Sequence, residues 1–219
     1  MIKYAIFDLD GTLLDSSEMW MDLGARYLSL LGKTPEEGLS ERLSLLSLPE
    51  SAEYLRGTYK IPRSSEEIIH QITKMTERFY LEEVKLKKGA LELLRVLRAH
   101  SVKMSIATAG DCTLGMAALK RLGAADCFAG AVGCNEFGPK TSPEVFLAAA
   151  ELIGAVPSET AVFEDSLHAV LTAKKAGFFT AAVWDIGEKN QRELKNFANA
   201  YAESLEIFAN NISDLLNRD

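Results

Sequence analysis

The sequence predicts an α/β protein with a doubly wound parallel sheet and a small, all-helical domain inserted after the first strand. From residue 87 onward, short apolar segments alternate with helical patterns. This alternation indicates parallel strands joined by right-handed helical crossovers. Between residues 15 and 86 the patterns are helical throughout, and no strand pattern interrupts them. We therefore expect a core of residues 1–14 and 87–219 and a helical domain of residues 15–86.

The first expected strand is Ile2–Phe7, an apolar run of the kind that is buried on both faces of a parallel sheet. Asp8 ends this run and Asp10 follows two positions later, so both carboxylates would point to one side of the extended chain. Gly11 allows a turn, and Thr12 brings a hydroxyl near the acids. Two carboxylates about 4 Å apart repel by about 4 kcal/mol in a protein-like dielectric. A cation or a shared proton would offset that repulsion.

Two simpler interpretations of this acidic stretch remain open. One is an ordinary turn without chemistry, because Asp and Gly are common turn residues. The other is a calcium-binding loop, although such a loop follows a helix and has its glycine at the sixth position. Here the glycine comes earlier, after a strand. We favour a catalytic pair of carboxylates.

The inserted domain is expected to contain several helices, because its apolar residues recur at helical spacing. Ser64 and Glu67 have the spacing of a capping box. The expected helices run from Trp20 to Leu31 with Gly32 as C-terminal cap, from Pro35 through Leu39, Leu43 and Leu46, from Pro49 to Gly57, and from Ser64 to Phe79.

The remaining core elements follow from the same patterns. Ser142 is expected to cap a helix whose first residue is Pro143. The expected strands are Val102–Ala107, Phe128–Val132, Thr160–Phe163 and Phe178–Val183. The expected helices cover residues 91–97, 114–122, 143–153, 167–176, 188–197 and 205–216.

Composition excludes several classes of function. The net charge of −7 argues against nonspecific binding of nucleic acid, which requires clustered positive charge. No run of 18 apolar residues occurs and the chain starts directly with a strand, so we expect neither a membrane span nor a signal peptide. The cysteines are odd in number and lack a metal-ligand spacing: Cys112, Cys127 and Cys134. We expect a cytoplasmic protein that is a monomer or a dimer.

Polar residues follow the other expected strands. In a doubly wound sheet the ligand lies at the carboxyl ends of the strands. Thr108 and Ala109, with a hydroxyl and a backbone N–H, could cradle a phosphate. Lys140, in the loop before a helix, could balance the carboxylates and hold phosphate. Glu164 and Asp165 directly follow a buried strand and suit Mg²⁺. Taken singly, each residue has an ordinary alternative: a turn threonine, a surface lysine, or an N-cap at Asp165.

The stretch Asp8–Ser16 resembles the first motif of the haloacid dehalogenase superfamily, D-x-D-G-T-L-x-D-S, at every position. Thr108, Lys140 and the Glu164–Asp165 pair resemble its later motifs. The resemblance implies that Asp8 is a nucleophile forming an aspartyl-phosphate, and that Asp10 is the general acid and then base. It also implies phosphate binding by Thr108, Ala109 and Lys140. For Mg²⁺ it implies ligation by the side chains of Asp8, Glu164 and Asp165 and the carbonyl of Asp10.

The helical insert resembles the first cap type of this superfamily, which beta-phosphoglucomutase and many phosphatases of small phosphorylated metabolites share. Mutase-like members carry a histidine where this chain has Trp20, and their second phosphate-binding arginine is absent from the loop around Leu48. We therefore expect a phosphatase rather than a mutase, with Glu18, Trp20 and Arg42 as candidates for substrate contact. A receiver-type signalling domain is a less favoured alternative, since its phosphorylated Asp lies on a later strand and it has no large helical insert. The histidines match no motif position, and we expect no role for them: His70, His100 and His168.

Overall fold

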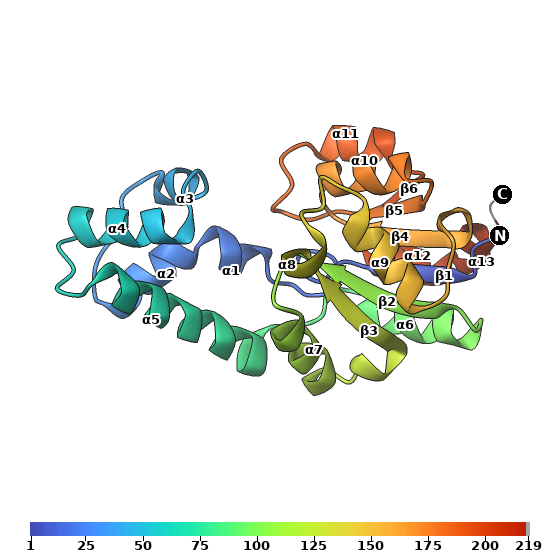
Figure 1. Ribbon diagram of the computed structural model, residues 1–219, viewed down its shortest axis with the longest axis horizontal. Coiled ribbons are helices and arrows are strands. Elements are labelled where there is room, and N and C mark those ends of the chain that lie inside the picture. The colour runs from blue at the N-terminus through green and yellow to red at the C-terminus, as the bar shows by residue number, and fades with distance from the viewer. Residues whose placement is uncertain (218–219) are drawn as a thin grey trace. The chain divides into compact units, whose positions relative to one another are not determined.

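A six-stranded parallel sheet forms the core of the protein, in the order β3-β2-β1-β4-β5-β6. The computed structural model describes residues 1–217 (Figure 1). The strands are β1 (Tyr4–Phe7), β2 (Lys103–Thr108), β3 (Phe128–Gly133), β4 (Thr160–Glu164), β5 (Phe179–Val183) and β6 (Ala200–Ala202). The predicted doubly wound parallel sheet is confirmed.

Strand β1 lies at the centre of the sheet, between β2 and β4. The chain runs outward from β1 through β2 to β3, then returns to β4 on the other side of β1. The direction of winding therefore reverses between β1 and β4. In open α/β sheets this reversal leaves a crevice at the carboxyl ends of the two strands, where ligands bind. The residues after β1 and β4 are thus placed for chemistry.

Helices cover both faces of this sheet. Apolar side chains of α9 and α10 pack on one face, against residues of β1, β2 and β4. Helix α6 packs with α12 on the other face, as the right-handed crossovers require (Figure 1). The helices are α6 (Ala90–Ala99), α7 (Cys112–Arg121), α8 (Cys134–Phe137), α9 (Glu144–Leu152), α10 (Leu167–Lys175), α11 (Gln191–Phe197), α12 (Leu205–Asn210) and α13 (Ile212–Leu216), with short 3-10 turns η2 (Ala125–Cys127) and η3 (Pro157–Glu159).

The strands that carry the acidic residues are buried almost throughout, with only Tyr4 of β1 partly exposed. Phe7 of β1 stacks on Phe163 of β4 with ring centroids 4.3 Å apart. Both rings are inaccessible to solvent, and burial of one such side chain contributes roughly 1.5–3 kcal/mol. The amide of Asp8 continues the pairing, since it donates to the carbonyl of Phe163 at 3.0 Å. The ends of β1 and β4 are therefore held side by side.

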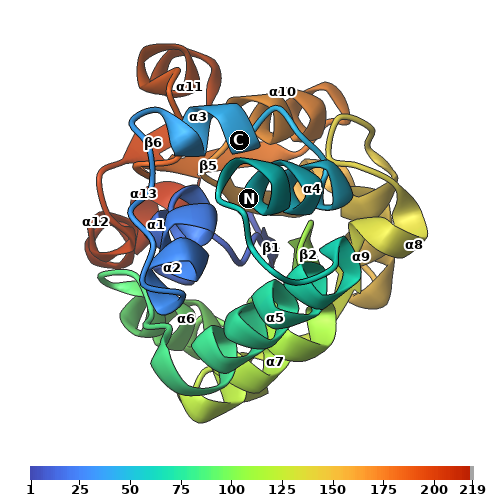
Figure 2. The same cartoon turned by 90° about the vertical axis from the view of Figure 1, so that its left-hand side faces the viewer.

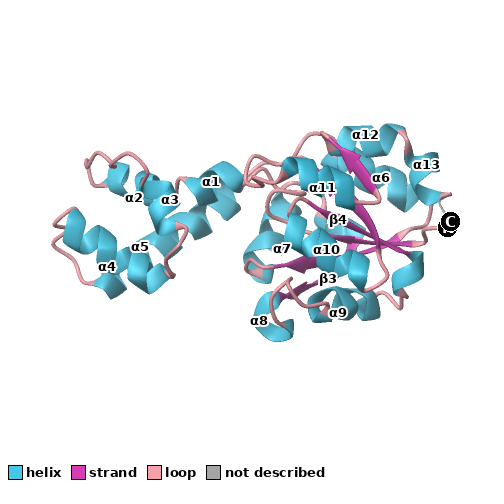
Figure 3. Ribbon diagram, turned by 90° about the horizontal axis from the view of Figure 1, so that it is seen from above, coloured by secondary structure: helices cyan, strands magenta, loops and turns pink. Residues whose placement is uncertain are grey.

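Residues Ser17–Glu83 form a second compact unit, distinct from Met1–Ser16 with Val84–Asp219. It consists of helices and loops only (Figure 3). Its helices are α1 (Ser17–Met21), α2 (Leu23–Leu30), α3 (Leu39–Leu43), α4 (Leu48–Thr58), α5 (Ser65–Arg78) and the π-helix η1 (Phe79–Glu83). Helices α4 and α5 pack side by side (Figure 2). The unit has its own buried core of Tyr27, Leu28, Leu39, Ala52, Leu55, Ile61, Ile68 and Ile72.

Both connections to the helical unit leave the core at one place. The amide of Asp15 donates to the carbonyl of Lys85 at 2.9 Å, and the amide of Lys87 donates to that of Leu13 at 2.9 Å. Leu14 and Leu86 form an antiparallel bridge between these bonds. The chain segments before and after the insertion are thus a short two-stranded pair.

Several predicted elements were wrong in detail. Pro35 lies outside any helix, and α3 begins only at Leu39. Pro143 is the N-cap of α9 rather than its first helical residue, and no side chain caps that helix. The expected helix of residues 205–216 is broken at Asn211 into α12 and α13, since asparagine favours helix ends. Strand β6 was not predicted because its three residues are too few to show a period.

Within residues 1–217, each helix falls short of the length and hydrophobicity required to cross a membrane.

Candidate active site

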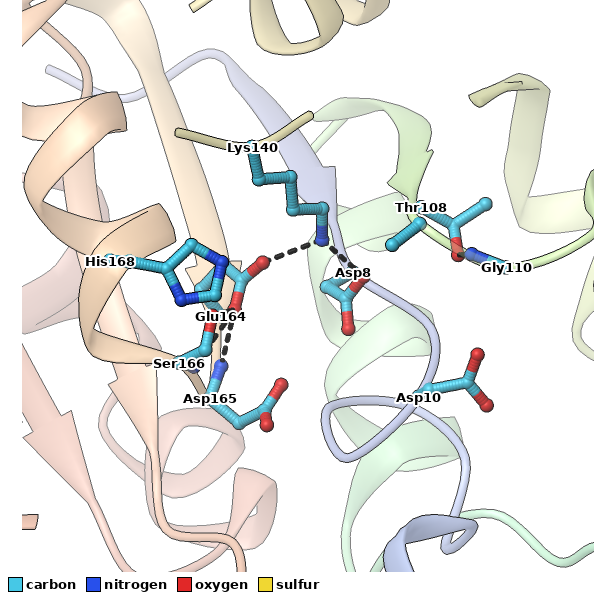
Figure 4. A pocket seen from close by; sticks show the side chains of 10 residues that line it. Asp8, Asp10, Thr108, Gly110, Lys140, Glu164, Asp165, Ser166 and His168 are labelled. Atoms are coloured by element: carbon cyan, nitrogen blue, oxygen red, sulfur yellow. Dashed lines mark hydrogen bonds and ion pairs between the residues drawn. The ribbon is translucent and has the colours of Figure 1, made fainter. Parts of the chain in front are cut away.

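A pocket lies at the carboxyl ends of β1, β2 and β4 (Figure 4). The predicted core residues come together there from loops that are distant in sequence. The pocket is lined by Asp8, Asp10, Thr108, Ala109, Gly110, Lys140, Glu164, Asp165, Ser166 and His168.

Lys140 lies between two buried carboxylates (Figure 4). Its ammonium group donates to Asp8 Oδ1 and, at 2.6 Å, to Glu164 Oε1. All three side chains are almost inaccessible to solvent. A buried charge is tolerated only when it is paired. Lys140 therefore neutralises part of the negative charge that the strand ends bring together, and the interpretation of a free surface lysine does not hold.

Burial changes the ionisation of these groups. Loss of hydration raises the pKa of Asp8 to about 7, although the Lys140 ammonium opposes the rise. Burial alone would lower the pKa of Lys140, but the facing carboxylates of Asp8 and Glu164 raise it above its ordinary value. Burial, followed by the charge of Glu164, also raises the pKa of Asp165. Ionisation of Asp8 and Asp165 is therefore unfavourable unless a further cation stabilises their charged forms.

The carboxylate of Glu164 accepts several hydrogen bonds besides that of Lys140. Its Oε2 accepts from the amides of Asp165 and Ser166, both at 2.9 Å, and from the Ser166 hydroxyl at 3.1 Å. Asp165 is held differently, since its Oδ1 accepts from the buried hydroxyl of Thr12 at 2.8 Å. Thr12 therefore links the loop after β1 to the loop after β4.

Three carboxylates can share a metal ion. Oxygens of Asp8, Glu164 and Asp165 lie within 4.8 Å of one another. Hard oxygen donors at such spacing suit Mg²⁺, which uses a few carboxylates and completes its shell with water or phosphate. The raised pKa values of Asp8 and Asp165 fit this donor set, because a cation would stabilise their ionised forms. The carboxylate of Asp10 is not part of this group.

Asp10 lies on the side of the pocket formed by the loop after β2 (Figure 4). Its Oδ1 accepts from the hydroxyl of Ser16 at 2.6 Å. A methyl group added at Gly110 would come within 2.9 Å of Asp10 Oδ2, so the glycine makes room for the acid. The amide of Gly110 donates to Thr108 Oγ1 at 3.0 Å. Ala109, between them, is exposed.

The family described as haloacid dehalogenase-like hydrolase matches residues 5–183. The chain belongs to this family. A phosphorylated carbohydrates phosphatase of Thermotoga maritima is 29% identical over 177 residues, 80% of this chain and 82% of that protein. The probable pseudouridine-5'-phosphatase of Drosophila melanogaster is 30% identical over 193 residues, 84% of this chain and 82% of that protein.

A solved structure of a beta-phosphoglucomutase candidate from Thermotoga maritima has a TM-score of 0.85 and 26% identity, covering 98% of this chain and 100% of that one. The similarity to phosphatases and to this structure confirms the predicted branch of the haloacid dehalogenase family. The predicted enzyme class, a phosphomonoester hydrolase of this family, is confirmed as well.

The candidate substrate residues lie in the helical unit of this haloacid dehalogenase-family enzyme. Glu18 and Trp20 are on α1, and the indole Nε1 of Trp20 donates to the hydroxyl of Tyr80 at 3.2 Å. Arg42 is on α3, with its Nε 3.7 Å from Glu36 Oε1 and its guanidinium 5.4 Å from the centre of the Tyr54 ring. Their part in substrate binding stays a prediction.

Sequence reasoning missed part of the haloacid dehalogenase-type pocket. Ser166 and His168 line it, and His168 had been expected to have no role. His168 is the second residue of α10 and lies three positions after Asp165. This closeness in sequence could have indicated that it lines the pocket. Thr12 was expected near the carboxylate pair, but its hydroxyl binds Asp165, a partner that only the fold reveals.

Proposed function

We propose that the protein is a Mg²⁺-dependent phosphatase that hydrolyses a small phosphorylated metabolite through an aspartyl-phosphate on Asp8. The observation that carries the proposal is the contact of Lys140 with both Asp8 and Glu164 at the switch point of the sheet. A carboxylate beside a buried ammonium group suits attack on a phosphoryl group, whose charge the ammonium can share. The phosphatases among the relatives support the same class of substrate.

The proposed reaction has two steps, in which Asp8 and Asp10 react and the other residues hold the phosphoryl group. An Asp8 oxygen forms a bond to phosphorus as the bond to the leaving alcohol breaks, and Asp10 gives its proton to the departing oxygen. Asp10 then takes a proton from water, whose oxygen bonds to phosphorus as the bond to Asp8 breaks, releasing phosphate. Lys140, Thr108 and the backbone of Ala109 hold the phosphoryl oxygens. Dividing the hydrolysis in this way lowers the barrier of an otherwise very slow reaction.

Mg²⁺ held by Asp8, Glu164, Asp165 and the carbonyl of Asp10 would supply positive charge that favours ionised carboxylates and offsets charge on the phosphoryl group. Thr12 orients Asp165 for this purpose, and Glu164 orients Lys140. We also propose that residues 15–86 act as a cap domain, with Glu18, Trp20 and Arg42 contacting the substrate. A cytoplasmic location and a monomer or dimer complete the proposal.

The test is hydrolysis of 4-nitrophenyl phosphate by Asp8→Asn. We expect repeated turnover by the wild-type protein with Mg²⁺, and loss of at least about a thousandfold in kcat for the variant. Asp126→Asn, which changes an exposed aspartate outside the pocket, is the matched control and should keep full activity. Appreciable turnover by Asp8→Asn would point to direct attack by water. A single phosphorylation without turnover would favour a phosphoacceptor instead.

A mutase is the second candidate, because the solved structure with a TM-score of 0.85 is described as a beta-phosphoglucomutase candidate. A mutase must hold two phosphates, and Trp20 can stack on a sugar but cannot pair with phosphate. We expect net phosphate release from beta-glucose 1-phosphate without formation of an isomer. Glucose 6-phosphate appearing faster than phosphate would overturn the hydrolase proposal.

A further inference from the structure

A buried ion pair lies behind the loop that carries Asp10. The ammonium of Lys87 is 2.6 Å from Asp185 Oδ2, and the two side chains are 12% and 3% exposed. Lys87 also donates to the carbonyl of Gly11 at 2.7 Å and to that of Trp184 at 2.8 Å. The other oxygen of Asp185 accepts from the amide of Gly187 at 2.8 Å. Three acceptors use all the donors that a lysine ammonium has.

One of these acceptors lies in the proposed catalytic loop. Gly11 directly follows Asp10 and has a φ of +82°, a conformation that its missing Cβ permits. The next residue, Thr12, donates its hydroxyl to Asp165. Gly11, whose backbone can turn freely, therefore connects the proposed acid Asp10 to Thr12, which supports the proposed metal ligand Asp165. Lys87 fixes the peptide group at that point.

The rest of the loop does not depend on the side chain of Lys87. The amides of Leu13 and Leu14 donate to the carbonyl of Leu9 at 2.9 and 2.8 Å, and the amide of Gly11 donates to the carbonyl of Leu14 at 3.0 Å. These bonds keep the turn closed without the ammonium group. Loss of Lys87 should therefore change the orientation of one peptide group rather than unfold the loop.

We propose that Lys87 and Asp185 are a positioning pair, which fixes the Gly11 carbonyl and so aims Asp10 at the leaving oxygen of the substrate. The proposal rests on the role of Asp10 in the proposed function. An acid that protonates the leaving group matters more when that group is a poor one. Phenyl phosphate, whose leaving group is more basic, needs this proton more than 4-nitrophenyl phosphate does.

The experiment measures kcat/KM for both esters with Mg²⁺, using the full chain and Lys87→Met. A second variant, Lys87→Met with Asp185→Asn, leaves no unpaired buried charge, so a folding defect of the first does not decide the result. Both variants should lose about tenfold or more on phenyl phosphate and less than about threefold on 4-nitrophenyl phosphate. The matched control is Lys88→Met, because Lys88 is 74% exposed and pairs with Glu206 at the surface. It should leave both rates unchanged.

Equal losses on the two esters would reduce the pair to a structural role and overturn the proposal, and so would the absence of any loss. A readout without catalysis is hydrogen exchange of the Thr12 amide, which belongs to the same peptide group as the Gly11 carbonyl and should exchange faster in the double variant than in Lys88→Met. If the wild-type protein hydrolyses neither ester, the proposed function fails by itself. Unchanged exchange would then overturn the positioning pair separately.

Discussion

At the scale of single residues, the pocket contains buried carboxylates whose ionised forms are not stabilised by water. Asp8 and Asp165 have raised pKa values because burial removes their hydration. The oxygens of Glu164 accept hydrogen bonds from Lys140 and from the amides of the loop that follows. Asp8 and Glu164 therefore share the ammonium group of Lys140, and Glu164 is held by backbone amides in addition.

This ionisation predicts how pH affects stability in EDTA. Between about pH 4 and pH 7, folded Asp8 keeps a proton that the unfolded chain has released, so stability should fall as pH rises through this range. The rise of the Asp8 pKa to about 7 corresponds to about 4 kcal/mol at most. We expect a lower Tm at pH 8 than at pH 5, and a larger Tm rise from added Mg²⁺ at pH 8, because protons compete with the metal.

Asp8→Asn isolates the contribution of this residue. It removes the titrating group while preserving the size of the side chain, so its Tm should change less between pH 5 and pH 8 than that of the wild type. An identical pH dependence in both proteins would assign the effect to other groups.

The two carboxylates at the end of β4, those of Glu164 and Asp165, should differ in their effect on metal affinity. Asp165→Ala should weaken Mg²⁺ binding more than Glu164→Ala, since the oxygens of Glu164 already accept from Lys140 and from the backbone. Isothermal titration with Mg²⁺ measures both affinities, and Glu151→Gln, an exposed position on α9, is the control. A greater loss in Glu164→Ala would reverse the assignment of the principal ligand.

Gly110 has a role that a larger side chain would prevent. Its substitution by alanine would place a methyl group 2.9 Å from Asp10 Oδ2, so the carboxylate would have to swing away from its present position. We expect Gly110→Ala to lower kcat for phenyl phosphate by about tenfold. Gly57→Ala is the control, because no atom lies within 4 Å of the added carbon. Equal activity of the two variants would show that Asp10 tolerates the displacement.

At the scale of elements, the long apolar strands and the capped helices could be predicted from sequence. Ser64 and Glu67 form the predicted capping box at the start of α5, because the motif is local and needs no tertiary contact. Features that depend on distant partners could not be predicted. The hydroxyl of Thr12 meets Asp165 across 153 positions of sequence. The Lys87–Asp185 pair likewise forms only when β1 and β5 enter one sheet.

The site was more predictable than the ends of the elements for a physical reason. Carboxyl ends of parallel strands share one edge, so Asp8, Thr108 and Glu164 had to converge once the strands were assigned. Helix ends depend on caps and neighbours instead. At Phe79–Glu83 the α-helical hydrogen-bond pattern changes to that of a π-helix. No glycine or proline in this segment indicates the change.

The capping box allows a prediction about the helical unit. Ser64→Ala should destabilise that unit by about 1 kcal/mol, because the amide of Glu67 loses its side-chain acceptor. Urea unfolding followed by circular dichroism measures the loss. Thr73→Ala, at an exposed position within α5, is the control and should be neutral or slightly stabilising. An unchanged midpoint for Ser64→Ala would show that the cap contributes nothing.

At the scale of the whole molecule, the proposed function assigns the reaction to the core and substrate selectivity to the helical unit. Trp20→Ala should raise KM for the physiological phosphate ester severalfold while leaving turnover of 4-nitrophenyl phosphate nearly unchanged, because the core pocket is untouched. Steady-state kinetics after a screen of phosphorylated metabolites measures both effects. Phe197→Ala, at an exposed position on α11 of the core, controls for the loss of an exposed aromatic ring. An unchanged KM would remove Trp20 from the substrate site.

The hydrogen-bonded pair between Leu13–Asp15 and Lys85–Lys87 gives the insertion a single point of attachment. A segment that begins and ends on adjacent strands can be exchanged for another of different length at little cost, since the loop-closure entropy grows only slowly with length. The sheet and its acidic edge are therefore compatible with many different inserts. Exchange of the inserted segment at this junction during evolution would change substrate specificity without altering the residues of the core pocket.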